Sequence, residues 1–335
     1  MPVGSGDDAE PSSTFVSDRP RPRRGQVRVP GESSTDTPLI RATGLTKLYG
    51  RQRGLLDLDL DVLPGEVFGY LGPNGAGKTT TIRLLLDLIR PTRGTASVLG
   101  LDSRRDSLAI RRRVGYLPGD LRLYESLSGR ELIAYFGALR GGVSEPRVRE
   151  LADALDCDLS REIRQLSSGN RQKLGLIQAF MSDPELLVLD EPTNGLDPLV
   201  QQRFYDLVVA ARTGGRTVFL SSHVLPEVER VCDRVGILRE GRLVAVERIA
   251  DLRERAIRRL EIRFCRPVAL DDFAGVVGTS ELAVDGDTLR CTVSGTMDPI
   301  LKAANRFEIR TVTSTEPSLE EVFLAYYGEE RPHAA

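Results

Sequence analysis

One glycine-rich segment of the sequence has the spacing of a phosphate-binding loop. Residues 72–79 read Gly-Pro-Asn-Gly-Ala-Gly-Lys-Thr, between an apolar run at 67–71 and a run of helical period from Thr80 to Leu88. Glycines allow successive backbone N–H groups to point at a phosphate chain, and the following helix adds the positive end of its dipole. We therefore expect Lys78 to reach the β- and γ-phosphates of a nucleotide and the Thr79 hydroxyl to bind Mg²⁺. An ordinary glycine-rich turn is the alternative, but a chance match is rare in a chain with only four lysines.

Two acidic residues follow a second apolar run. Leu186–Leu189 is typical of a buried strand, and Asp190 and Glu191 come directly after it. Because the carboxyl ends of parallel strands share one edge of a sheet, both acids should lie beside the phosphate loop. Asp190 suits Mg²⁺ coordination through water, and Glu191 suits a general base that orients the attacking water. Capping of the next helix is the structural alternative for both acids.

Three shorter patterns contain further residues that could contact a nucleotide. Residues 166–170 read Leu-Ser-Ser-Gly-Asn, which is typical of a helix N-cap and could bind an anion through backbone N–H groups. Gly195-Leu196-Asp197 and then Ser221-Ser222-His223 follow later in the chain. A histidine directly after a strand can equally be structural, and capping alone is the alternative for Ser167.

The order of these patterns resembles the ATP-binding subunit of an ABC (ATP-binding cassette) transporter over about residues 39–247. The resemblance implies ATP and Mg²⁺ as cofactors, and it implies roles for individual residues. The family's Walker A loop corresponds to Gly72, Asn74, Gly75, Gly77, Lys78, Thr79 and Thr80, and its Walker B pair corresponds to Asp190 and Glu191. The family's signature corresponds to Ser167 and Gly169, and its D-loop corresponds to Asp197. The switch histidine corresponds to His223, and the aromatic residue that stacks on adenine corresponds to Tyr49. A plain strand-edge position is the alternative for Tyr49.

The chain departs from the family pattern at three positions. The signature usually has glycine where Ser168 stands and glutamine where Asn170 stands. In Tyr-Leu-Pro-Gly-Asp (116–120), the family's glutamine is replaced by Gly119, so its role is vacant or passes to Asp120. Residues 319–328 resemble the tail of the type 2 exporter subgroup, which handles drugs, lipids or polysaccharides.

Composition excludes several classes of protein. A chain of 335 residues is longer than a single hydrophobic core usually organises. The content of 40% apolar and 5% aromatic residues predicts a globular core built from aliphatic side chains. The 46 basic and 48 acidic residues nearly cancel, which argues against a nucleic-acid partner. Four separated cysteines without a CxxC pair argue against a zinc site or a disulfide framework. With no apolar run of membrane-spanning length and no signal sequence, we expect a chain that is neither exported nor membrane-spanning.

Periodicity divides the chain into segments that can position these residues. Residues 1–37 are rich in Pro, Ser and Arg and predict a disordered tail, although the arginines could instead touch acidic lipid head groups. Leu58, Leu60 and Val62 alternate with aspartates, which predicts an antiparallel β layer. Short apolar runs at 67–71, 114–117, 186–189, 218–220 and 235–238 alternate with helical stretches, as in a parallel α/β sheet. The block at 127–182 has helical patterns only and predicts an inserted helical subdomain, with Pro146 at the start of a helix.

The pattern changes after Val246. Strands at 260–265, 281–284, 288–293 and 309–312, with helices near Val268 and Ile300, give the order β-α-β-β-α-β of a ferredoxin-like unit. The predicted fold is thus an α/β P-loop NTPase of the ABC cassette type with an antiparallel β layer and a helical subdomain, plus a small α+β C-terminal domain. The predicted boundaries are a tail at 1–37, the cassette at 38–247, a regulatory or dimerisation domain at 248–328 and a tail at 329–335.

Together these features predict an ATP-hydrolysing subunit that dimerises around two ATP molecules and powers export through a separate integral-membrane permease. The resemblance implies a peripheral position on the cytoplasmic face of a bacterial membrane, and a second ATP-binding subunit as partner in a homodimer. One alternative is a non-transport ABC ATPase acting on ribosomes or DNA, but the chain lacks a second cassette or a long coiled-coil insertion. Another is an ATP-binding regulator without turnover, which Gly119 favours and Glu191 disfavours.

Overall fold

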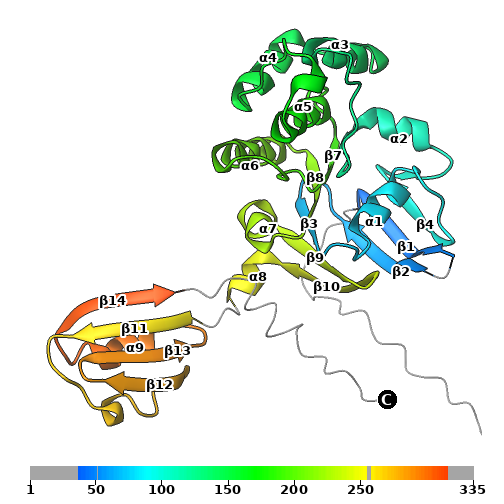
Figure 1. Ribbon diagram of the computed structural model, residues 1–335. Coiled ribbons are helices and arrows are strands. Elements are labelled where there is room, and N and C mark those ends of the chain that lie inside the picture. Colours follow the sequence, from blue (N-terminus) through cyan, green and yellow to red (C-terminus); the bar gives the residue numbers. More distant parts are fainter. Residues whose placement is uncertain (1–36, 51, 255–257, 316–335) are drawn as a thin grey trace, which may run out of the picture. The chain divides into compact units, whose positions relative to one another are not determined.

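A six-stranded sheet forms the centre of the ATP-binding region in the computed structural model, which describes residues 37–50, 52–254 and 258–315 (Figure 1). Its strand order is β10-β9-β3-β8-β7-β6. All neighbours are parallel except β9 and β10, which form an antiparallel hairpin. The strands are β3 (Val67–Leu71), β6 (Val114–Leu117), β7 (Leu186–Asp190), β8 (Thr217–Ser222), β9 (Arg234–Arg239) and β10 (Arg242–Arg248). The five predicted apolar runs are confirmed as strands of this sheet.

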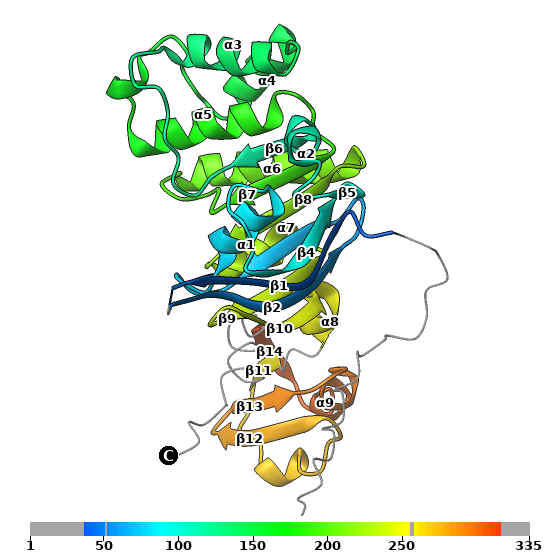
Figure 2. The same cartoon turned by 90° about the vertical axis from the view of Figure 1, so that its right-hand side faces the viewer.

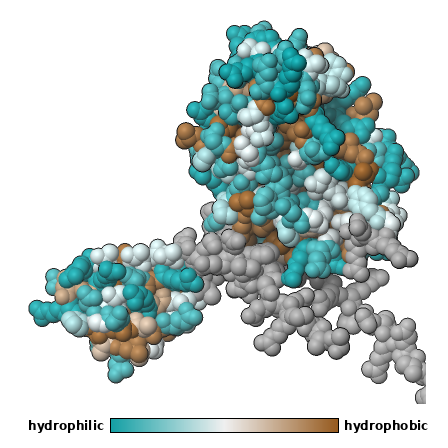
Figure 3. Space-filling view, in the orientation of Figure 1, coloured by the Kyte–Doolittle hydropathy of each residue, from teal (hydrophilic) through white to brown (hydrophobic). Residues whose placement is uncertain are grey.

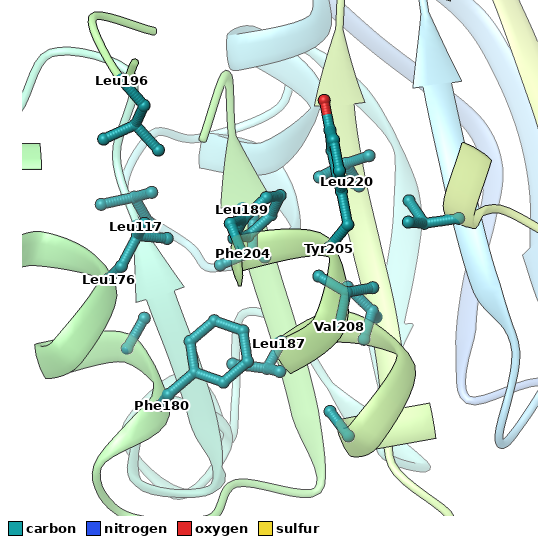
Figure 4. Packing of buried hydrophobic residues seen from close by; sticks show 14 of the residues in the cluster. Leu117, Leu176, Phe180, Leu187, Leu189, Leu196, Phe204, Tyr205, Val208 and Leu220 are labelled. Carbon is teal, nitrogen blue, oxygen red and sulfur yellow. The ribbon is translucent and has the colours of Figure 1, made fainter. Parts of the chain in front are cut away.

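Both faces of the central strands are buried, which explains why their sequences are apolar without interruption. Leu187 and Leu189 of β7 pack on one face with α6 (Pro198–Thr213), while Leu186 and Val188 belong to the cluster on the other face. Figure 4 shows part of the cluster that contains Leu187 and Leu189, to which α6 contributes Phe204. Besides α6, the helices that contact the sheet include α1 (Lys78–Leu85), α2 (Ser107–Arg113), α5 (Ser168–Phe180), α7 (Leu225–Val231) and α8 (Ile249–Glu254).

The predicted antiparallel layer is confirmed as a sheet of order β2-β1-β4-β5. Its strands are β1 (Ile40–Tyr49), β2 (Gln52–Val62), β4 (Arg93–Val98) and β5 (Leu101–Asp102). Leu58, Leu60 and Val62 are buried while the aspartates between them are exposed, as the alternation predicts. Helix α1 contacts β2 and β4 of this layer and β7 of the central sheet, so the helix that follows the phosphate loop is held between two sheets.

The block at 127–182 is helical, as predicted. It contains α3 (Gly129–Leu139), α4 (Glu145–Ala154), the 3₁₀ turn η1 (Ile163–Gln165) and α5 (Ser168–Phe180), which gather at one end of the cassette in both views (Figures 1 and 2). A capping box starts α3, because the Ser128 hydroxyl accepts from the Glu131 N–H and the Glu131 carboxylate accepts from Ser128 N–H. Pro146 is the second residue of α4, where a missing N–H leaves no bond broken.

Residues 258–315 form an α+β region with its own antiparallel sheet, of order β12-β13-β11-β14. The elements are β11 (Arg258–Phe264), the 3₁₀ turn η2 (Leu270–Asp272), β12 (Thr279–Asp285), β13 (Thr288–Val293), α9 (Asp298–Ala304) and β14 (Ile309–Thr315). The helix predicted near Val268 is wrong, since only the single turn η2 forms there. Glycines with positive φ at Gly275 (78°) and Gly278 (82°) interrupt the segment before a longer helix can form.

Several predictions fall outside the described residues: nearly all of the 1–37 tail, the exporter-like segment at 319–328 and the 329–335 tail. Among the residues that are described, no helix has the length and apolar character required to cross a bilayer. On the face of the molecule seen in Figure 3, apolar residues occur in separate small groups among hydrophilic ones.

Candidate active site

The phosphate loop connects β3 to α1, and two of its glycines are required by close backbone contacts. A Cβ on Gly72 would lie 2.4 Å from the carbonyl oxygen of Leu238, and one on Gly77 would lie 2.5 Å from that of Gly54. Gly77 also has φ 111° at the N-cap of α1, a conformation that favours glycine. The loop is therefore fixed against neighbouring strands, with the N-terminus of α1 directed at the site.

Most of the predicted nucleotide-binding residues line one pocket of about 320 Å³. Its lining residues are Tyr49, Gly54, Asn74, Gly75, Gly77, Lys78, Thr79, Thr80 and Glu191. Tyr49 is the last residue of β1 and is 44% exposed, with Lys47 Nζ over its ring, 5.3 Å from the ring centre. Gly54 was not expected here, because nothing in its local sequence indicates a contact with the loop.

Two of the predicted residues, Lys78 and His223, converge on the carboxylate of a third, Glu191. Lys78 Nζ donates to the Gly72 carbonyl at 2.6 Å and lies 3.1 Å from Glu191 Oε1. His223 Nδ1 lies 2.8 Å from Glu191 Oε2. The side chains of Lys78 and Glu191 are only 6% and 12% exposed, so this ion pair is poorly screened by water. The structure thus brings the lysine, the acid and the histidine together, through an ion pair at Glu191 Oε1 and a hydrogen bond at Oε2.

The two predicted metal-binding residues also meet. Thr79 Oγ1 donates to Asp190 Oδ2 at 2.7 Å, and Asp190 is fully buried at the end of β7. A hydroxyl and a carboxylate are the hard oxygen ligands that Mg²⁺ prefers, so these two residues fit the ion and would hold it here. Burial and the charge of Asp190 together raise the pKa of the nearby Tyr116 hydroxyl to about 12, so this phenol stays neutral.

Gly119 lies against this carboxylate, at the position where the family has glutamine. A Cβ on Gly119 would be 3.0 Å from Asp190 Oδ2, which is closer than most real contacts of a Cβ atom. Asp120 is exposed and forms an ion pair with Arg122 at 3.2 Å. The glycine therefore leaves free the space beside Asp190 that a side chain would occupy.

The signature and D-loop residues act as helix caps in the described chain. Ser167 is the N-cap of α5, where its hydroxyl accepts from Asn170 N–H at 3.3 Å. Asp197 caps α6 by accepting from the N–H groups of Leu199 and Val200, which lowers the pKa of Asp197. A Cβ on Gly169 would lie 2.5 Å from the Gly195 carbonyl, so the two loops touch.

None of the pocket-lining residues, within the described part of the chain, comes from 166–170 or 195–197. The structure therefore does not bring Ser167, Gly169 or Asp197 to the phosphate loop of the same subunit. They lie at the N-termini of two neighbouring helices instead.

Two residues around Glu191 were missed by sequence reasoning. Gln172 Nε2 donates to the carbonyl oxygens of Glu191 and Pro192 at 3.3 and 3.0 Å. Ser221 contacts both acids at the end of β7. These contacts join segments about 20 to 30 residues apart in the chain, so no local sequence pattern predicts them. The position of Ser221 two residues before His223 was the only sequence feature that pointed to the site.

Comparisons with known proteins agree with this geometry. Residues 55–194 match the family model described as ABC transporter. The chain is 33% identical to the bacitracin transport ATP-binding protein BcrA of Bacillus licheniformis over 87% of this chain and 97% of that protein. It is 35% identical to the daunorubicin resistance ATP-binding protein DrrA3 of Streptomyces coeruleorubidus over 87% and 96%. Among solved structures, a dimeric ATP-binding cassette, MJ0796 with ADP and Pi, is similar in fold, with a TM-score of 0.59 at 22% identity over 63% of this chain and 98% of that one. The chain belongs to the family of ATP-binding subunits of ABC transporters.

Proposed function

We propose that this chain hydrolyses ATP to power an exporter, with each of the residues around the pocket in a defined role. The observation that carries this proposal is the convergence of Lys78, Glu191 and His223 beside the Thr79–Asp190 pair. Binding of ATP alone would need the lysine and the glycine-rich loop. Hydrolysis also needs an acceptor beside the γ-phosphate, and Glu191 lines the same pocket.

In this proposal Lys78 binds the β- and γ-phosphates, and Glu191 orients the attacking water and accepts its proton. His223 holds Glu191 through Oε2 and contacts the γ-phosphate. Thr79 and Asp190 would hold Mg²⁺, which neutralises charge on the phosphates when bound. The rest of the phosphate-binding loop is formed by Gly72, Asn74, Gly75, Gly77 and Thr80. Tyr49 stacks on adenine.

The position of the signature residues supports a dimer as the active form. Ser167, Gly169 and Asp197 lie outside the pocket lining of their own subunit. We propose that they complete the pocket of a second, identical subunit, so that two ATP molecules are held between two chains. The dimeric form of the related cassette is consistent with this arrangement.

We propose a drug, lipid or polysaccharide as the exported substrate, carried by a separate integral-membrane permease. The names of the relatives support this class, since one is a bacitracin transport protein and another a daunorubicin resistance protein. The subunit would then sit on the cytoplasmic face of a bacterial membrane.

For the C-terminal region we propose a ferredoxin-like domain with a regulatory or dimerisation role. The sheet order β12-β13-β11-β14 supports this topology, although η2 replaces the first helix. A separate apolar cluster that includes Leu260, Phe264 and Ile300 supports an independent core. Ile249 and Leu252 of α8 instead pack in the cassette core, so we place the boundary after Glu254 rather than after 247.

Two substitutions test the roles of the pocket residues. Lys78→Ala should abolish tight ATP binding, because it removes the buried cation that meets the phosphates. Glu191→Gln should keep ATP binding and lower kcat by about 100-fold or more, the scale of a lost positioned base. Binding of a fluorescent ATP analogue and phosphate release measure the two effects, with the distant Lys302→Ala as the control. Turnover near the wild-type value in Glu191→Gln would disprove the assignment of the base.

A further inference from the structure

Ser221 lies between the two acids at the end of β7. It is the register partner of Asp190 in the parallel β7–β8 pair, and it is fully buried. Its hydroxyl donates to Asp190 Oδ1 at 2.5 Å and accepts from the backbone N–H of Glu191 at 3.2 Å. A single hydroxyl therefore joins the side chain of one acid to the main chain of the other.

The hydrogen bond to Asp190 fixes the plane of its carboxylate. Oδ2 accepts from Thr79 and Oδ1 accepts from Ser221, so each oxygen has one donor. A fully buried carboxylate without such donors is costly, and with one donor it can rotate about its Cβ–Cγ bond. Partners behind a metal ligand normally set the ligand's orientation in this way.

The hydrogen bond to Glu191 acts on a strained backbone. Glu191 has φ 50°, in the left-handed region that residues other than glycine rarely adopt. Such a conformation persists where surrounding contacts hold it. Here the Glu191 N–H donates to both the hydroxyl and the carbonyl of Ser221, while its carbonyl accepts from Gln172. The turn directs the Glu191 side chain back toward Lys78 and His223.

We propose that Ser221 is a positioning residue that aligns Asp190 for Mg²⁺ and Glu191 for the attacking water at the same time. The inference rests on the proposed roles of those two acids, and Ser221 itself is not among the residues that line the pocket. Loss of its hydroxyl leaves Asp190 Oδ1 buried without a donor and removes one support of the strained turn at Glu191. Both the response to Mg²⁺ and the rate of hydrolysis should then fall together.

Ser222 provides a matched control. It is also fully buried in β8, but its hydroxyl donates to Glu227 at 2.8 Å and accepts from Val224 N–H, away from both acids. Ser221→Ala and Ser222→Ala therefore delete the same group at the same depth.

The test compares both variants of the full chain in three measurements: thermal melting, binding of a fluorescent ATP analogue with and without Mg²⁺, and kcat with KM. For Ser221→Ala we expect the affinity for the ATP analogue without Mg²⁺ to be unchanged. The increase in that affinity on adding Mg²⁺ should be about 10-fold smaller than in wild type, and kcat should be lower by about 10-fold or more. For Ser222→Ala both quantities should stay within about 3-fold of wild type. Equal Mg²⁺ responses and equal kcat values in the two variants would overturn the inference.

A third variant guards against loss of folding in Ser221→Ala. Ser221→Cys keeps a small side chain with a weaker donor, so its Mg²⁺ response and kcat should lie between those of wild type and alanine. Wild-type values in Ser221→Cys would refute the positioning role. Failure of the proposed function gives a different result, because turnover would then be unchanged in Glu191→Gln as well as in Ser221→Ala. If only the positioning role fails, turnover falls in Glu191→Gln and is unchanged in Ser221→Ala.

Discussion

At the scale of single residues, the pocket holds contacts that ATP must replace. Lys78 lies 3.1 Å from Glu191, and this pair is almost inaccessible to water. A polyphosphate carries more negative charge than one carboxylate, so its arrival draws the ammonium toward the ligand and weakens the hold on Glu191. The proposed base thus becomes available when its substrate is in place, while His223 keeps its other oxygen oriented.

Gly169 gives a residue-scale prediction that separates ATP binding from hydrolysis. In Gly169→Ala the new Cβ would lie 2.5 Å from the Gly195 carbonyl, so the start of α5 must shift away from the loop that leads to Asp197. We expect ATPase activity to fall by about 10-fold or more, because small displacements of positioning groups are costly. ATP binding to the single subunit should stay within about 3-fold, since Gly169 does not line the pocket.

Ser168→Ala is the control for this change, as Ser168 is the exposed neighbour and should keep activity within about 2-fold. Phosphate release and analogue binding measured on both variants decide the matter. Equal activity in Gly169→Ala and Ser168→Ala would show that the contact with Gly195 is dispensable.

At the scale of elements, the sequence predicts best where burial is complete. The central strands are recognisable because apolar residues fill both faces, and β13 forms over the expected residues 288–293. Strand β4 is harder to identify, since Arg93–Val98 is polar and exposed in its first half and is defined by its pairing with β1. The contacts of Gln172 and Ser221 with the Walker B acids depend on tertiary packing, so local pattern could not reveal them.

Helix α8 gives a prediction about where the cassette ends. A chain ending at Glu254 should melt cooperatively and bind ATP, because it keeps the buried Ile249 and Leu252. A chain ending at Arg248 lacks both side chains, and its free energy of unfolding should be lower by about 3 to 6 kcal/mol. Thermal and urea unfolding of the two truncated chains, with ATP binding, test this. A non-cooperative melt of the longer one would refute both the boundary and an independent cassette.

At the scale of the whole molecule, the proposed function gives each chain two incomplete halves of a catalytic site. The phosphate loop and Glu191 line one pocket, and Asp190 and His223 contact its residues Thr79 and Glu191. Ser167 and Gly169 lie instead at the start of α5. The net charge of −2 gives no general attraction for phosphate, so binding depends on these local donors. A second copy is the proposed source of the missing half.

Mixing two inactive variants tests this composite arrangement. Lys78→Ala damages the phosphate loop and Ser167→Arg damages the signature, so each homodimer should be inactive. In the heterodimer one site carries both defects, while the other joins an intact Lys78 to an intact Ser167 from the partner. Because the γ-phosphate of the proposed dimer is bound by donors from both chains, partial ATPase activity should return when differently tagged variants are mixed and the heterodimers purified. A heterodimer of wild type with Lys78→Ala is the control, because its activity shows that one intact site is sufficient. If this control is active and the purified mixed-variant heterodimers show only background activity, the site is completed within one subunit.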